Sequence, residues 1–254
     1  MWSRYVALGD SFTEGLMDET GPDGRHRGWA DRLACQLQAI NPDLLYANLA
    51  IRGRLLGQVV DEQVPQALAL NPDLVTIAAG VNDTLRRSYD LHSAMTSLEN
   101  AVIALRGSGA DVVLVAFGDP SRRSKVMSSV SGRIAAANAA TLAIAQQYGC
   151  RVVEFWGCAA FDDDTFWDED RLHLSPAGHA LAARAAAEAL GVGDDTWRTP
   201  QPLTDSGGPL HRAAGHARWA RRHFAPWVGR RLRGQSSGDL IEPKQPALAP
   251  PACP

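Results

Sequence analysis

Short runs of consecutive apolar, β-prone residues recur along the first two thirds of the chain. Most of them are apolar at successive positions and do not alternate with polar residues, which is typical of parallel strands covered on both faces. We therefore expect five buried strands, over residues 5–8, 46–50, 74–79, 112–117 and 152–155.

Between these runs the apolar residues recur every three or four positions, which is the spacing along one face of an amphipathic helix. Other intervening stretches are rich in alanine and favour helix by propensity. Helices are expected over residues 29–40, 55–70, 91–105, 132–148 and 176–190. Pro65 should end, kink or restart the second of these helices, because proline lacks the N–H that a helix interior needs.

The alternation of strand and helix predicts a three-layer α/β/α domain, in which a five-stranded parallel sheet lies between two layers of helices with right-handed crossovers. In such sheets the functional groups gather beyond the carboxyl ends of the strands. Gly-Asp-Ser at residues 9–11 follows the first run, and polar residues within 48–53 and 80–83 follow the second and third. We expect the site at this edge.

Ser11 is the candidate nucleophile, because a strand that turns sharply at Gly-Asp-Ser presents a hydroxyl at its tip. Asp170 and His173 stand three residues apart, so one short turn can hold the carboxylate against the imidazole whose other nitrogen faces Ser11. Ser175 and Pro176 then supply an N-cap and a first-turn proline, which fix His173 just before the last helix. We predict His173 as general base and then acid, and Asp170 as the group that holds its tautomer.

An oxyanion needs hydrogen-bond donors that are already in place. A glycine lets the backbone approach a ligand closely, so the N–H of Gly53 is one candidate donor. The side-chain amide of Asn82 is a second candidate, and the N–H of Ser11 is a third.

Each of these assignments has a structural alternative. Ser11 can be a simple helix N-cap, and Asn82 with Asp83 can be turn residues that satisfy their own backbone. The loop before Asp170 holds further carboxylates, including Asp168, although none of them is three residues from His173.

Structural roles are expected for Asp10, the aspartate of the Gly-Asp-Ser motif, and for the remaining histidines. Asp10 is expected to support the turn. The histidines at positions 26, 92 and 179 have no matching acidic partner, so we expect them at the surface or the rim of the site.

Four blocks of the chain, taken together, resemble the SGNH hydrolase superfamily, also called the GDSL esterase/lipase family. They are residues 9–11, 48–53, 80–83 and 170–173, which follow the family's order and rough spacing. Phe12 stands where the name-giving motif has Leu. The resemblance implies a flavodoxin-like sheet and hydrolysis of esters or thioesters without metal or cofactor, and it gives Ser11, Gly53 and Asn82 the same oxyanion roles.

The predicted function is cleavage of a carboxylic ester, either an acyl ester or an O-acetyl group, through a covalent acyl-serine intermediate. The alternatives are acyl transfer or thioester hydrolysis at the same serine, and a binding protein that keeps the fold without catalysis. Polar loops at 18–28 and 119–131 argue mildly against long acyl chains, whereas Phe12 and Trp167 can form an apolar wall. Short acyl esters, acetylated sugars and thioesters all stay open. The expected partner is a small-molecule ester and not a nucleic acid.

Cysteine usage and apolar run lengths bear on the compartment. The four cysteines, at positions 35, 150, 158 and 253, have no metal-ligand spacing, and we expect unpaired thiols. No apolar run approaches the ~18 residues of a membrane span, and residues 1–4 lead directly into the first run. The expectation is a cytoplasmic protein without signal peptide or membrane span.

Charge divides the chain unevenly, with a net −9 over residues 1–195 and +6 over residues 196–254. We expect a catalytic domain over 1–195 and a basic, aromatic helical extension over 196–228, with a helix at about 210–224 packed on the acidic domain. Residues 229–254 are expected to be a disordered tail rich in Pro, Gly and Arg, because they offer little apolar surface to bury. A basic tail that binds nucleic acid or an anionic membrane is the more elaborate alternative.

Overall fold

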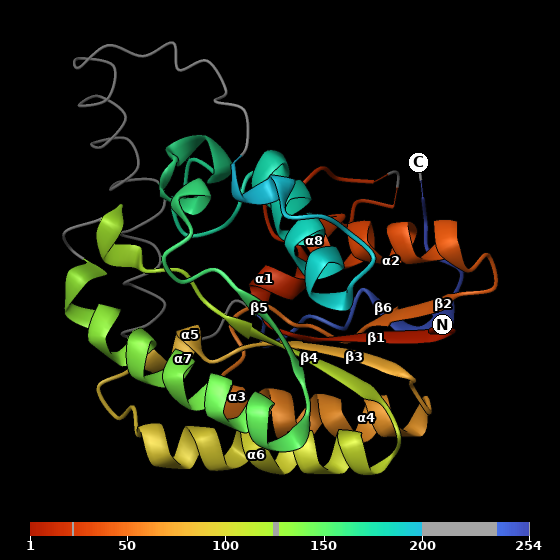
Figure 1. Ribbon diagram of the computed structural model, residues 1–254, viewed down its shortest axis with the longest axis horizontal. Coiled ribbons are helices and arrows are strands. Elements are labelled where there is room, and N and C mark those ends of the chain that lie inside the picture. Colours follow the sequence, from red (N-terminus) through yellow and green to blue (C-terminus); the bar gives the residue numbers. More distant parts are fainter. Residues whose placement is uncertain (22, 124–126, 200–237, 254) are drawn as a thin grey trace.

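The computed structural model describes residues 1–21, 23–123, 127–199 and 238–253. A six-stranded sheet in the order β5-β4-β3-β1-β2-β6 forms the middle layer (Figure 1). Five strands pair in parallel and the sixth is antiparallel to β2. The strands are β1 (Arg4–Gly9), β2 (Leu45–Asn48), β3 (Leu74–Ala78), β4 (Asp111–Ala116), β5 (Arg151–Glu154) and β6 (Gln245–Ala249).

Helices cover both faces of the sheet (Figure 1). One face packs against α2 (Gly28–Ile40) and α8 (Pro176–Leu190), and the other face against α4 (Val64–Ala69), α6 (Leu91–Gly107) and α7 (Ser128–Tyr148). The single-turn helices are α1 (Ser11–Glu14), α3 (Leu56–Gln58) and α5 (Val81–Thr84). A π-helical turn spans Val59–Gln63, and 3-10 turns span Pro120–Arg122, Ala159–Asp162, Asp164–Phe166 and Thr196–Arg198.

The predicted fold class is confirmed for the five parallel strands and the two helical layers. The central strands are buried on both faces, since Tyr5, Leu8, Leu74 and Val113 are fully enclosed. This double burial explains why their sequences read as continuous apolar runs. Pro65 restarts the helix, because it lies in the first turn of α4, where its missing N–H costs nothing.

The predicted disorder of residues 229–254 is wrong for the part that the structure describes. Residues 245–249 form β6 along the free edge of β2, with Tyr46 opposite Ala249 and Asn48 opposite Gln245. The apolar-area argument missed this strand because backbone pairing at an open sheet edge needs little apolar side chain. The predicted helix at 210–224 and its packing lie outside the described residues.

Residues beyond the expected domain boundary at 195 continue the core. The indole of Trp197 is 1% exposed and packs edge-on against Phe155. Its Nε1–H donates a 2.6 Å hydrogen bond to the carboxylate of Glu188 on α8. Of the extension predicted over 196–228, these first residues are therefore part of the folded domain.

The prediction that all four cysteines are unpaired thiols is also wrong. Cys35 of α2 and Cys253 form a disulfide with a Cα–Cα distance of 5.6 Å, while Cys150 and Cys158 are free. Disulfides persist mainly in oxidising compartments, so cysteine usage no longer supports a reducing cytoplasm. Among the described residues, no helix combines the length and apolarity needed to cross a membrane.

Thiol titration tests the disulfide. The denatured but unreduced chain should show two reactive thiols, those of Cys150 and Cys158, and four after reduction. The double variant Cys35→Ser/Cys253→Ser should show two thiols under both conditions. Four thiols in the unreduced wild-type chain would exclude the bond.

Candidate active site

Ser11 lies where β1 ends and α1 begins, at the carboxyl edge of the sheet. At Gly9 the neighbouring strand is so close that a Cβ atom would sit 2.3 Å from the carbonyl oxygen of Ala78, so only glycine fits. Asp10 caps α1 by accepting a 3.1 Å hydrogen bond from the N–H of Phe12. The N-cap is therefore Asp10 and not Ser11, whose hydroxyl is left for other contacts.

A continuous chain of hydrogen bonds joins Ser11, His173 and Asp170. The Oγ of Ser11 is 3.0 Å from Nε2 of His173. On the other side of the ring, Nδ1 is 2.6 Å from Oδ2 of Asp170. Because the carboxylate only accepts, Nδ1 carries the proton and Nε2 is free to accept from the Ser11 hydroxyl. The structure thus brings Ser11 beside His173, which lies 162 positions later in the sequence and carries Asp170 with it on the same turn.

The turn from Asp170 to His173 holds the carboxylate in its ionised form. Arg171 has a φ of 58°, which turns the chain so that the N–H groups of Leu172 and His173 both donate 2.9 Å hydrogen bonds to Oδ1 of Asp170. Burial alone would raise the pKa of Asp170, but the hydrogen bonds and charge of His173 and these N–H groups outweigh it and lower the pKa to about 2. Asp168 instead donates its backbone N–H to the carbonyl of His173, and the carboxylate bonded to the imidazole ring is that of Asp170.

Asn82 lies in α5, directly after β3, and faces the residue next to Ser11. Its Nδ2 donates to Oδ2 of Asp10 at 3.0 Å and to the carbonyl oxygen of Arg54 at 3.1 Å. Its amide therefore links the loops that follow three adjacent strands, which is more than a turn residue would do. Asp10 has a role beyond the turn, and burial raises its pKa to about 7.

Gly53 lies in the loop after β2, and that loop is tied to the helix of Ser11 by a contact that sequence reasoning missed. The carboxylate of Glu14, the last residue of α1, accepts a 2.7 Å hydrogen bond from the backbone N–H of Arg52 and pairs with its guanidinium. The spacing of Glu14 and Arg52 carries no periodic signal, so only the fold reveals the pair.

His179 corrects another expectation, since it is buried and not at the surface or rim. Its Nδ1 accepts from the N–H of Trp29 at 3.2 Å, and its Nε2–H donates to the carbonyl of Leu16 at 2.9 Å. Burial lowers its pKa to about 4, so the ring is neutral and ties α8 to α2 and to the loop after α1.

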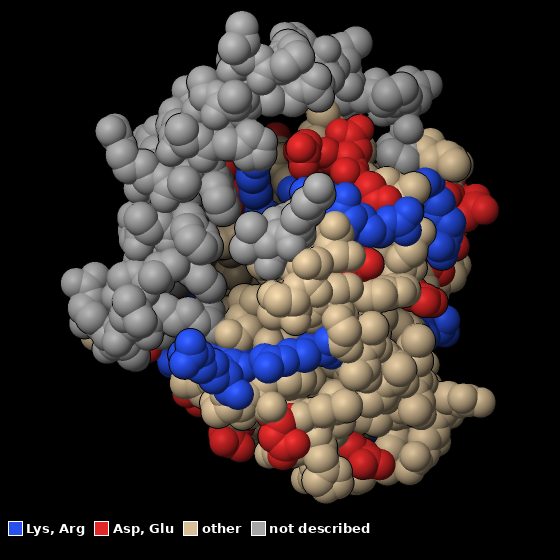
Figure 2. All heavy atoms as spheres, turned by 90° about the vertical axis from the view of Figure 1, so that its left-hand side faces the viewer, with Lys and Arg blue, Asp and Glu red and all other residues tan. Residues whose placement is uncertain are grey.

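Figure 2 views the molecule from the edge where the parallel strands end. On the described part of this face, groups of Lys/Arg and of Asp/Glu side chains lie between larger areas of uncharged residues. In the loops near the site, the guanidinium of Arg123 lies 3.9 Å from the ring centre of Trp167 and pairs with Asp164. Within the described ranges, no group of three or more His, Cys, Asp and Glu side chains forms a metal-ligand set.

The sequence model of the GDSL-like Lipase/Acylhydrolase family matches residues 7–181, which include every candidate site residue. The chain belongs to this family. The resemblance to the SGNH or GDSL hydrolases is thereby confirmed, and the protein is a carboxylic ester hydrolase of that type. No curated protein matches this hydrolase.

Solved structures resemble this GDSL-type hydrolase in fold. LAE5, an alpha/beta hydrolase enzyme from the metagenome of Lake Arreo, is 22% identical with a TM-score of 0.63, over 76% of this chain and 97% of that one. Axe2, an acetylxylan esterase from Geobacillus stearothermophilus, is 19% identical with a TM-score of 0.59, over 76% and 97%. TesA is 22% identical with a TM-score of 0.61, over 74% and 98%.

Replacing the carboxylate of Asp170 should destabilise this hydrolase in a pH-dependent way. A pKa lowered on folding from 3.8 to about 2 stabilises the folded state by about 2 kcal/mol above pH 4, and this stability is lost as the pH falls through about 2. Asp170→Asn should therefore be less stable than wild type by about that amount at pH 7, with the difference shrinking between about pH 4 and 2 in denaturant unfolding.

Asp168→Asn is the matched control, because burial raises the pKa of that carboxyl. The sign is then reversed, since ionised Asp168 opposes folding above its folded pKa, and the variant should lose no stability at pH 7. An Asp170→Asn deficit that is equal at pH 7 and pH 2 would mean that the carboxylate charge is not its source.

Proposed function

We propose that the protein cleaves a carboxylic ester through a covalent acyl-serine intermediate formed on Ser11. The observation that carries this proposal is the unbroken chain of hydrogen bonds from Asp170 through His173 to the Ser11 hydroxyl. His173 takes the hydroxyl proton as Ser11 attacks the ester carbonyl, and then gives it to the leaving alcohol. Asp170, held in its ionised form by three hydrogen bonds from Leu172 and His173, stabilises the imidazolium that forms between these steps.

The oxyanion of the tetrahedral intermediate is assigned to three donors. The N–H groups of Ser11 and Gly53 are backbone donors, and the side chain of Asn82 supplies the third. Both N–H groups of the Asn82 amide are donated in this structure, one to Asp10 and one to the carbonyl of Arg54. One of these two hydrogen bonds is released when Asn82 donates to the oxyanion, and the support for this role is that its amide lies against Asp10, the residue next to Ser11.

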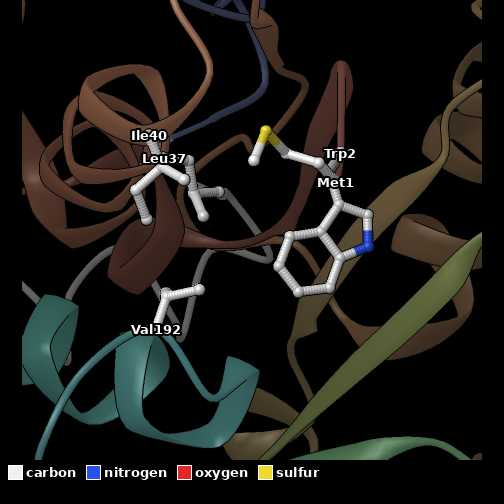
Figure 3. Close-up of a pocket in the computed structure, with 5 residues that line it drawn as sticks. All are labelled: Met1, Trp2, Leu37, Ile40 and Val192. Atoms are coloured by element: carbon white, nitrogen blue, oxygen red, sulfur yellow. The ribbon is translucent and has the colours of Figure 1, made fainter.

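The acyl group of the substrate is proposed to be short. The loop that leads to Asp170 carries ion pairs, of Asp162 with Arg122 and of Asp164 with Arg123, which suits a polar alcohol portion better than a long alkyl chain. The described part of the chain does hold an apolar pocket, shown in Figure 3, but it lies at the amino end of β1, opposite Ser11, and is lined by Met1, Trp2, Leu37, Ile40 and Val192. An acetylated sugar belongs to this class, and Axe2, which resembles this protein in fold, is an acetylxylan esterase.

A hydrolysis screen tests the function and its alternatives. Short and long p-nitrophenyl esters, acetylated sugars and acyl-thioesters are compared, with the Ser11→Ala protein as blank. Short esters should be turned over fastest. Faster loss of thioesters would favour thioesterase activity, and product esters formed on adding an alcohol would favour acyl transfer. If turnover equals that of the Ser11→Ala blank on all substrates, the remaining alternative is a binding protein that keeps the fold without catalysis.

Ser11→Ala should abolish ester hydrolysis with little change in melting temperature, because the hydroxyl's hydrogen bond to His173 is partly exposed to solvent. A fluorophosphonate should label Ser11 in the wild-type protein, as located by peptide mapping. Ser97→Ala, a change on the exposed face of α6, should leave both activity and labelling intact. Labelling of a different serine in the wild type would overturn the assignment of the nucleophile.

Asn82→Ala should lower kcat by roughly 100- to 1,000-fold, or about 2.7–4 kcal/mol, because one oxyanion donor is lost. KM should change little, since the donor matters most in the transition state. Steady-state kinetics on a short ester measures both constants. A raised KM at constant kcat would instead make Asn82 a residue that binds substrate.

A further inference from the structure

The last described segment of the chain, residues 238–253, returns to the domain and is called here the C-terminal strap. In Figure 1 this blue segment runs beside β2 and ends next to α2. β6 lies within it and pairs with β2, and the disulfide from Cys253 to Cys35 closes its far end onto α2. The strap is thus attached by backbone pairing on one side and covalently on the other.

One side chain of the strap, Lys244, reaches into the interior of the domain. Its ammonium group donates to the carbonyl oxygens of Glu14 at 2.7 Å, His26 at 2.8 Å and Arg27 at 3.1 Å, and to the carboxylate of Asp31 at 2.6 Å. The side chain is only 9% exposed. Four acceptors around a nearly enclosed ammonium make a cation site that the distant end of the chain fills.

This cation site adjoins the candidate nucleophile. Glu14 is the last residue of α1 and Ser11 is the first, so Lys244 holds the carboxyl end of the one-turn helix whose amino end presents the hydroxyl. The other carbonyls that Lys244 binds belong to His26 and Arg27, the two residues that precede α2. Without the ammonium, the partly negative carbonyl oxygens would face one another and the half-buried carboxylate of Asp31, which is costly unless the segments move apart.

The strap also contacts the loop that carries Gly53. Gly238 is packed so closely that a Cβ atom there would lie 2.1 Å from the carbonyl oxygen of Arg52. The neighbouring Asp239 has a carboxylate oxygen 3.9 Å from the guanidinium of Arg54, whose own carbonyl accepts from Asn82. The strap therefore contacts both the helix of Ser11 and the loop of a proposed oxyanion donor.

We propose that Lys244 is a positioning residue for Ser11, carried into place by the C-terminal strap, and that the strap is part of the catalytic unit. The proposal rests on the function assigned to Ser11 above. Protecting the edge of β2 would need only the backbone pairing of β6. The ammonium contacts to α1 and the close approach of Gly238 to Arg52 add nothing to that protection, and both bear on groups that must be aligned for acyl transfer.

The test compares three variants of the full-length protein at a temperature well below all their melting transitions. Lys244→Met keeps most of the side-chain volume and removes the donors. It should lower both kcat on a short p-nitrophenyl ester and the rate of fluorophosphonate labelling at Ser11 by about 10- to 100-fold, with KM little changed, because the nucleophile is displaced and not the substrate pocket. Gly238→Ala should lower kcat in the same way by pushing on Arg52, and it carries the test if Lys244→Met does not fold.

Gln245→Ala is the matched control from the same strap. The side chain of Gln245 donates a 2.6 Å hydrogen bond to the carbonyl of Tyr46 in β2, on the side of the strap that pairs with the sheet. This variant should lower the melting temperature and leave kcat and the labelling rate unchanged. A purely structural strap would instead give all folded variants wild-type kcat and labelling rates, and that result overturns the proposal.

The same measurements separate this proposal from the proposed function. If the wild-type protein shows no Ser11-dependent turnover or labelling, both proposals fail. If the wild type is active and Lys244→Met, or Gly238→Ala in its place, matches its kcat and labelling rate, only the positioning role fails.

Discussion

The parallel register of β1 between β2 and β3 is the constraint on which the site depends. Ala7 is aligned with Asn48 on one side and Gly9 with Ala78 on the other, so the three strands end at nearly the same level. The loops that leave them then meet at one edge, and residues far apart in sequence become neighbours there. The fourth group of site residues reaches this edge by another route, because it precedes α8, which packs against α2 on one face of the sheet.

Buried polar contacts convert this rough proximity into a fixed geometry. Asn82 bridges Asp10 and the carbonyl of Arg54, and Glu14 binds the backbone of Arg52. Each contact joins the loop of one strand to the loop of another. In a low-dielectric interior such hydrogen bonds are strong when complete and costly when one partner is missing, so they resist displacement of any single loop.

The five parallel strands and the candidate site residues could be predicted from the sequence because their signals are local. Continuous apolar runs mark doubly covered strands, and Gly-Asp-Ser and Asp-x-x-His are short motifs. The failures involve partners that local pattern does not show. His179 is held by backbone atoms of Leu16 and Trp29, and Cys35 pairs with a cysteine 218 residues away. The prediction of disorder for the strap failed for a further reason. Composition indicates how much apolar area a segment can bury, whereas β6 is held by backbone pairing and by a disulfide.

The role of Lys244 also changes how the basic charge of the C-terminal region is understood. The basic helix expected to pack on the acidic domain lies outside the described residues, whereas within the strap the basic contact with the interior is one ammonium in one site. Only two of the 25 basic residues in the chain are lysines, and this is one of them. An arginine presents a planar fork suited to a carboxylate, as Arg52 does with Glu14, whereas converging carbonyls suit a compact ammonium with three rotatable donors. The chemistry of the acceptors therefore selects lysine at this position. The positive charge acts through the contacts of one ammonium group more than through the net charge of the C-terminal region.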